Sequence, residues 1–145
     1  MFRRILIVCR GNICRSPTAQ YLFQSRTKLR GIEVTSAGLN AVVGSAMDAM
    51  SLQLLNEKDG VDGSSHRAIQ LVPSMLLGAD LVIGMEREHI DEMMEVAPEA
   101  RGKIYLLDKW LDGRDVPDPF RKKRPVFEHA HEMIERGVDS WMRYL

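Results

Sequence analysis

The chain has 145 residues, of which 45% are hydrophobic and 28% are charged. This composition excludes a disordered chain and is typical of one globular domain, so we expect residues 1–145 to form a single domain. Lysine plus arginine and aspartate plus glutamate each number 20, so the formal net charge is zero. No global charge therefore indicates binding to nucleic acid or to a membrane surface.

Strands and helices are predicted to alternate along the chain. The predicted elements are a strand at residues 4–8, a helix at 17–29, a strand at 33–37, helices at 47–56 and 72–77, a strand at 80–84, a helix at 87–97, a strand at 103–107 and a long helix at 125–144. This alternation predicts an α/β fold of three layers, with a four-stranded parallel sheet and helices on both faces. Ligands of such sheets bind at the carboxyl ends of the strands, which favours the loop after the first strand.

That loop carries residues suited to phosphate chemistry. It reads Cys9-Arg10-Gly11-Asn12-Ile13-Cys14-Arg15-Ser16-Pro17. Ser16 and Pro17 predict the N-cap and the first residue of the next helix. Inward-facing backbone N–H groups and the helix N-terminus can cradle an oxyanion and stabilise a thiolate at Cys9. Because the planar guanidinium of Arg15 can hold two phosphate oxygens, the pattern predicts a nucleophilic cysteine directed at a phosphate ester.

A second candidate element lies far downstream, at residues 115–120. Its two prolines keep the segment out of helix and sheet, which predicts a stiff loop. Asp118 on this loop can act as a general acid. An aspartate before a proline is also a common turn residue, but the presence of Cys9 and Arg15 favours the catalytic interpretation.

Cys9 and Cys14 are the two cysteines of the chain. Their spacing, with no histidine nearby, is not typical of a zinc site, and a structural disulfide is not expected in a reducing compartment. No apolar run reaches the length of a membrane span and the first residues lack a signal-peptide pattern, so we expect a cytoplasmic protein. Cys14 either packs the loop or forms a reversible disulfide that shields Cys9 from over-oxidation, and both interpretations stay open.

The chain resembles the low-molecular-weight protein tyrosine phosphatases over nearly its whole length. The resemblance rests on the motif at residues 9–17, on Ser36-Ala37-Gly38, His66, Asp80-Leu81-Val82 with Met85-Glu86, and Asp118-Pro119. Within this family the chain is most similar to the bacterial members that act with the tyrosine kinases of capsule and exopolysaccharide export. Residues 36–39 and 117–122 carry that finer resemblance.

The resemblance implies a catalytic set. Cys9 is the nucleophile that forms a cysteinyl-phosphate intermediate, Arg15 binds the phosphoryl oxygens, and Asp118 protonates the leaving phenolate and then activates water. The phosphate-binding loop residues are Arg10, Gly11, Asn12, Ile13, Cys14 and Ser16. No metal and no cofactor are expected, because the cradle and Arg15 supply the positive field.

Three residues are expected to support the loop. Ser16 donates a hydrogen bond to the sulfur of Cys9. Asn12 holds a strained turn, since asparagine tolerates a positive φ better than most residues. His66 anchors Asn12, although a lone histidine is also often a surface or core residue without function.

The chain departs from the family at the expected entrance to the site. Phe120 replaces the tyrosine that often follows Asp-Pro, and residues 39–43 lack the aromatic residue of the animal members. Leu39, Val42 and Phe120 are expected to line the entrance. These changes leave the identity of the protein substrate open.

The expected function is hydrolysis of phosphotyrosine on the tail of a bacterial tyrosine autokinase, by a monomer that does not insert into a membrane. The basic run at residues 121–124 is either a solvated approach to the last helix or an electrostatic guide for an acidic phosphopeptide. Arsenate reduction is a competing hypothesis, but its thioredoxin-linked form needs cysteines beyond Cys14. A non-catalytic phosphotyrosine-binding module is a third, which the joint presence of Cys9, Arg15 and Asp118 disfavours.

Overall fold

A computed structural model describes residues 2–145 and contains one parallel sheet of four strands. The strands are β1 (Arg4–Cys9), β2 (Glu33–Gly38), β3 (Leu81–Gly84) and β4 (Ile104–Leu106), in the spatial order β2-β1-β3-β4. β1 lies between β2 and β3, and Val8 pairs with both Ala37 and Gly84. The loop after β1 therefore leaves the sheet at its centre, where the chain reverses the direction in which strands are added.

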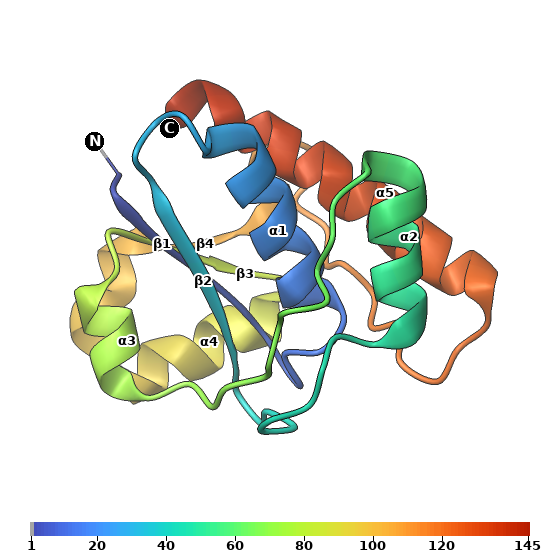
Figure 1. Cartoon of the computed structure of the whole chain (residues 1–145). Coiled ribbons are helices and arrows are strands. Elements are labelled where there is room, and N and C mark those ends of the chain that lie inside the picture. Colours follow the sequence, from blue (N-terminus) through green and yellow to red (C-terminus); the bar gives the residue numbers. More distant parts are fainter. Residues whose placement is uncertain (1) are drawn as a thin grey trace.

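Helices cover both faces of this sheet (Figure 1). The helices α1 (Arg15–Thr27), α2 (Ala49–Asp59) and α5 (Arg124–Trp141) gather on one side, and α3 (Pro73–Gly78) and α4 (Arg87–Val96) lie on the other. Short 3-10 turns span Pro98–Lys103, Leu107–Trp110 and Met142–Tyr144. The predicted three-layer α/β architecture is confirmed. Within residues 2–145, no helix combines the length and the apolar character needed to cross a membrane.

The two faces of β1 explain its unbroken apolar run. Ile5, Ile7 and Cys9 belong to the apolar cluster beneath α1 and α5, whereas Leu6 and Val8 belong to the cluster beneath α3 and α4. A strand buried on both faces has no solvent-facing positions, so polar residues do not alternate along it. Packing on both sides fixes the end of β1, and with it the position of Cys9.

The start of α1 differs from the sequence-based expectation. Cys14 occupies the N-cap position and its side chain makes no capping hydrogen bond, so the prediction of Ser16 as N-cap was wrong. Ser16 lies in the first helical turn, where its hydroxyl contacts the sulfur of Cys9 and the side chain of Asn12. The hydroxyl cannot cap the helix and make these contacts together, and the tertiary contacts prevail. Pro17 is the third helical residue, a position where its missing N–H breaks no helical hydrogen bond.

Candidate active site

The loop between β1 and α1 directs its carbonyl groups outward. The carbonyls from Cys9 to Ile13 accept hydrogen bonds, in chain order, from Leu39, Asn40, Val42, His66 and Asp48, at 2.7–3.1 Å. Gly38 permits this close packing, because a Cβ there would lie 2.7 Å from the carbonyl oxygen of Arg10. The carbonyl and the N–H of a peptide point in opposite directions, so the N–H groups of this loop face inward. This is the geometry expected of a backbone cradle for an anion.

A cavity of about 200 Å³ opens over this loop. It is lined by Cys9, Arg10, Gly11, Ile13, Cys14, Arg15, Asn40, Val42, Asp118 and Phe120. Cys9 and Arg15 are 2% and 3% exposed, whereas half of the Asp118 side chain is exposed. The fold therefore brings the two candidate elements from distant parts of the sequence to one cavity, with the cysteine buried and the aspartate nearer to solvent.

Ser16 and Asn12 form a hydrogen-bond network behind the sulfur of Cys9. The Ser16 Oγ lies 2.9 Å from the Cys9 Sγ, and the Asn12 Nδ2 donates to the Ser16 Oγ at 2.8 Å and to the Ser36 Oγ at 2.9 Å. Because Asn12 donates into the Ser16 oxygen, the hydroxyl hydrogen of Ser16 is available to the sulfur. A hydrogen bond donated to the sulfur stabilises negative charge on it.

Asn12 is held in a left-handed backbone conformation, with φ of 60°. Its carbonyl oxygen accepts from the His66 Nε2 at 2.7 Å, and its Oδ1 accepts from the backbone N–H of Ile69 at 2.9 Å. A carbonyl can only accept, so the Nε2 of His66 carries the proton. Burial lowers the pKa of His66 below its usual value, which favours this neutral tautomer. The structure thus brings together the residues that were expected to support the loop.

Arg15 is fixed by three groups on the far side of the cavity. Its Nη1 donates to the Val116 carbonyl at 2.8 Å and pairs with the carboxylate of Glu86. Its Nη2 lies 3.7 Å from the Asp118 Oδ2. Glu86 was quoted in the family resemblance without a role, and the structure shows that it holds Arg15. Its place just after β3, the parallel neighbour of β1, is the signal by which sequence reasoning could have found it.

The loop that bears Asp118 is attached to the turn between β3 and α4. The backbone N–H of Val116 donates to the Met85 carbonyl, and the Asp115 Oδ1 accepts from the backbone N–H of Arg87, both at 2.9 Å. The Asp118 Oδ1 accepts from the backbone N–H of Phe120 at 3.1 Å. The turn after β3 therefore positions the aspartate loop as well as Arg15.

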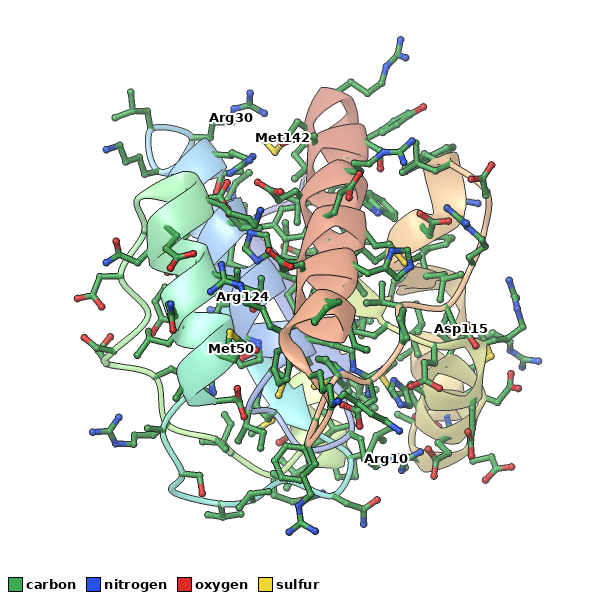
Figure 2. All side chains as sticks on the ribbon, turned by 90° about the vertical axis from the view of Figure 1, so that its right-hand side faces the viewer. Arg10, Arg30, Met50, Asp115, Arg124 and Met142 are labelled. Atoms are coloured by element: carbon green, nitrogen blue, oxygen red, sulfur yellow. The ribbon has the colours of Figure 1, made fainter. Side chains whose placement is uncertain are left out.

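One predicted entrance residue lies outside the cavity, and the side chain of one loop residue faces α4. The guanidinium of Arg10 turns away from the cradle toward α4, where it binds the Glu92 carboxylate at 2.6 and 3.2 Å and the Asn40 Oδ1 at 2.9 Å (Figure 2). Arg10 still lines the cavity, where the expected anion donors are the N–H groups of the loop rather than this side chain. Leu39 does not belong to the cavity lining; it packs against the apolar cluster that contains Leu6, and Asn40 lines the cavity in its place.

Cys14 lines the cavity, and its side chain also packs against the core. It packs with Leu54 and Phe127, and burial, followed by the nearby charge of Asp48, raises the pKa of its thiol to about 12. Cys9 and Cys14 are both free thiols in this structure. The protonated, buried state of Cys14 supports the packing interpretation, and the reversible disulfide stays a prediction.

One group within residues 2–145 brings three side chains of metal-ligand type together. Asp59, His131 and Glu135 place their ligand atoms within 4.8 Å of one another, outside the lining of the 200 Å³ cavity. A guanidinium nitrogen of Arg26 lies 3.7 Å from the carboxylate of Asp59. An arginine already supplies positive charge to this cluster, which is therefore described below as an ionic network.

Comparisons with known proteins agree with this site. Residues 4–145 match the family model described as low molecular weight phosphotyrosine protein phosphatase. The low molecular weight protein-tyrosine-phosphatase Etp of Escherichia coli K12 is 40% identical over 144 residues, which cover 99% of this chain and 95% of Etp. The structure of Vibrio vulnificus Wzb in complex with benzylphosphonate covers 100% of both chains, with 36% identity and a TM-score of 0.95. The tyrosine phosphatase AmsI of Erwinia amylovora has 37% identity and a TM-score of 0.94, over 100% of this chain and 94% of AmsI.

These matches cover nearly the whole chain, and their sequence identities of 36–40% indicate a shared family and not only a shared fold. The chain therefore belongs to the low molecular weight phosphotyrosine protein phosphatase family, and it is a hydrolase of that class. The family resemblance read from the motif at residues 9–17 is confirmed.

Proposed function

We propose that residues 1–145 act as a single phosphatase domain that hydrolyses phosphotyrosine on the tail of a bacterial tyrosine autokinase of capsule or exopolysaccharide production. The observation that carries the chemistry is the shared cavity of Cys9, Arg15 and Asp118. A buried sulfur, an anion cradle and a half-exposed carboxyl group are the three parts that phosphoryl transfer through cysteine needs. Similarity to the tyrosine phosphatases Wzb and AmsI supports phosphotyrosine as the substrate group.

The first step transfers the phosphoryl group to the enzyme. The thiolate of Cys9 attacks phosphorus, the bond from phosphorus to the tyrosine oxygen breaks, and Asp118 in its acid form gives a proton to that oxygen. The inward N–H groups and Arg15 bind the three equatorial oxygens, where the negative charge is spread in the transition state. Tyrosine leaves as a neutral phenol, and Cys9 carries the phosphoryl group.

The second step hydrolyses the cysteinyl phosphate. Asp118, now a carboxylate, takes a proton from a water molecule whose oxygen attacks phosphorus. The bond from phosphorus to sulfur breaks, and the electron pair returns to the sulfur as inorganic phosphate forms. The hydroxyl of Ser16, which lies 2.9 Å from the sulfur, stabilises the returning negative charge.

The surroundings of the cavity support an aryl substrate with an acidic peptide. Val42 and Phe120 line the cavity and are 48% and 40% exposed, so they offer apolar surface to a tyrosine ring. In the adjoining basic run, Arg124 pairs with Glu57 and Glu128. The rest of the run, residues 121–123, is exposed, and its positive charge can attract acidic or multiply phosphorylated segments.

The test compares substrates and variants in a buffer that contains a metal chelator. We expect the natural chain to release phosphate from a phosphotyrosine peptide of an autokinase tail, and the variant Cys9→Ser to release none. Replacing Lys122 and Lys123 by glutamate should slow turnover of this peptide about tenfold but that of phenyl phosphate less than twofold, because long-range attraction acts on the charged peptide.

Several outcomes would contradict the proposal. An active Cys9→Ser variant contradicts the mechanism, and equal effects of charge reversal on both substrates contradict the guiding role of the basic run. Thiol-dependent production of arsenite from arsenate favours the reductase hypothesis. Tight binding of the phosphopeptide without turnover favours the binding-module hypothesis. The proposal includes a monomer in the cytoplasm, where reducing conditions keep Cys9 a free thiol.

A further inference from the structure

A buried histidine with an unsatisfied nitrogen lies next to the candidate site. His89, in the first turn of α4, is 1% exposed, and within residues 2–145 its Nδ1 is the one buried side-chain nitrogen or oxygen without a hydrogen-bond partner. Burying such a group without a partner destabilises the fold, and a leucine would fill similar space without that penalty. Any favourable interaction of the imidazole must therefore come through its other nitrogen, Nε2.

The other nitrogen of His89 faces the group that holds Arg15. Its Nε2 lies 3.5 Å from the Glu86 Oε2, and this same oxygen pairs with the Arg15 Nη1. The separation is longer than an ideal hydrogen bond, but hydrogen bonds of an active site are often long before substrate binds and shorten in the complex. His89, Glu86 and Arg15 thus form a chain that ends at the phosphate cradle.

The charges around His89 favour its neutral form. Burial lowers its pKa most, the charge of Arg15 lowers it further, and Arg10 acts in the same direction. The carboxylates of Glu86 and Glu92 oppose this shift. A neutral imidazole that faces a carboxylate carries its proton on the facing nitrogen, so the Nε2–H dipole of His89 points at Glu86.

We propose that His89 is a positioning residue that orients the Glu86 carboxylate and thereby keeps Arg15 aimed into the cradle. The inference rests on the role proposed above for Arg15 as the phosphoryl-binding side chain. Because the Met85 carbonyl and the N–H of Arg87 also hold the Asp118 loop, the turn after β3 and the first turn of α4 together support both functional groups. His89 acts through Glu86 and touches no reacting atom.

The test uses variants that separate the two ring nitrogens. His89→Gln places an amide near the position of Nε2, and His89→Asn places one near Nδ1. For phenyl phosphate at neutral pH, we expect His89→Leu and His89→Asn to lower kcat/KM and to weaken inhibition by inorganic phosphate about tenfold each, since the contact of Nε2 with the charged Glu86 carboxylate is lost. His89→Gln should retain both values within about threefold.

A double-mutant cycle tests the path through Glu86. In a Glu86→Gln background the same His89→Leu change should alter phosphate inhibition less than twofold, because the oriented carboxylate is already gone. The control is His131→Gln on α5, a buried histidine that pairs with Asp59 instead, and it should leave phosphate inhibition unchanged. Thermal unfolding of every variant identifies losses that come from misfolding.

The pH dependence is a second readout that does not require the leucine variant to fold. Protonated His89 competes with Arg15 for Glu86, so inhibition of the natural chain by phosphate should weaken toward about pH 5 more steeply than that of His89→Gln. Equal effects of Gln and Asn, an undiminished effect of His89→Leu in the Glu86→Gln background, or parallel pH profiles would each overturn the inference. If Arg15→Lys keeps its phosphate affinity, the proposed mechanism fails instead, whatever the His89 variants do.

Discussion

Two clusters of buried polar side chains stabilise this fold, and they use different chemistry. Behind the candidate nucleophile, Asn12, Ser16, Ser36 and His66 form a network of neutral groups, with hydrogen bonds of 2.7–2.9 Å. Between α2 and α5, ionisable groups meet: the His131 Nε2 lies 2.8 Å from the Asp59 Oδ2 and 3.8 Å from the Glu135 Oε1, and Arg26 lies beside Asp59.

The two clusters respond differently to protons. The neutral network has few groups that change charge near neutral pH, so the cradle it supports keeps its shape while the sulfur of Cys9 gains and loses negative charge. In the ionic cluster, burial and the hydrogen bond and charge of Asp59 raise the pKa of Glu135 to about 7. The comparison indicates that the first cluster serves activity and the second serves stability, and the following variants test that division.

The largest effect is expected for Arg15→Lys. Lysine keeps the charge but cannot hold two phosphate oxygens in one plane, so kcat/KM for phenyl phosphate should fall about 10³-fold. The matched control is Arg26→Lys in the ionic cluster, which should keep kcat/KM within about twofold. Steady-state kinetics measure both, and a comparable loss in the two variants would remove the distinction between the phosphate cradle, which the neutral cluster supports, and the ionic cluster.

A somewhat smaller loss is expected for Asp118→Ala. Without the general acid, kcat/KM for phenyl phosphate, which reports the phosphoryl-transfer step, should fall about 10²-fold, whereas that for p-nitrophenyl phosphate should fall less because its leaving group departs without a proton. Asp112→Ala, an exposed aspartate upstream in the same connection, is the control and should act like the natural chain. An equal loss for both substrates would show that Asp118 has another role.

Asn12→Ala should affect activity and stability together. Alanine tolerates a φ of 60° poorly and removes the side-chain bonds to Ser16, Ser36 and Ile69. We expect kcat/KM to fall about tenfold and the free energy of unfolding to fall by about 2 kcal/mol. Urea denaturation and kinetics measure these values. The exposed Asn56→Ala is the control, and an Asn12 variant as active and stable as this control would contradict the network.

The smallest effect is expected for Glu135→Gln, and it concerns stability alone. The ordinary pKa of this carboxyl is 4.5, so between pH 4.5 and about 7 the folded chain holds a proton that the unfolded chain has released. Stability is therefore lost as the pH rises through this window. Glutamine cannot ionise, and because Glu135 is partly solvated we expect a gain of only about 1 kcal/mol at pH 8, and none below pH 4.5. Urea titrations at both pH values would refute the account if the gain were equal at each.

Much of the fold could be predicted, because its signals are local. The apolar run of β1 is buried on both faces, and each predicted strand and helix lies within a few residues of its observed position. Helix ends were less accurate. α2 begins at Ala49, after an N-cap at Asp48 whose carboxylate accepts two backbone N–H groups, rather than at residue 47. Capping depends on which side chains are free of tertiary contacts, and a local pattern does not contain that information.

The candidate site was predictable where chemistry is concentrated in a short motif. Residues 9–17 and Asp118 were identified as site candidates because a cysteine, an arginine and an aspartate in these loops form an uncommon combination. The contacts of Glu86 with Arg15 and with His89 were missed because they depend on β3 lying beside β1, which is a property of the sheet order. Leu39 was misplaced for a similar reason: its backbone N–H bonds to Cys9, while its side chain turns to the opposite apolar cluster.

The most direct measurement locates the phosphoryl group on the enzyme. The Asp118→Ala variant, which we expect to hydrolyse the intermediate slowly, is mixed with p-nitrophenyl phosphate, quenched rapidly and digested with trypsin. Cleavage after Arg10 and Arg15 separates Cys9 from Cys14, so mass spectrometry assigns the added phosphoryl group to one of them. We predict that the peptide of residues 5–10, which contains Cys9, carries it. A phosphoryl group on the peptide of residues 11–15, or product formation with an unmodified Cys9 throughout, would contradict the account.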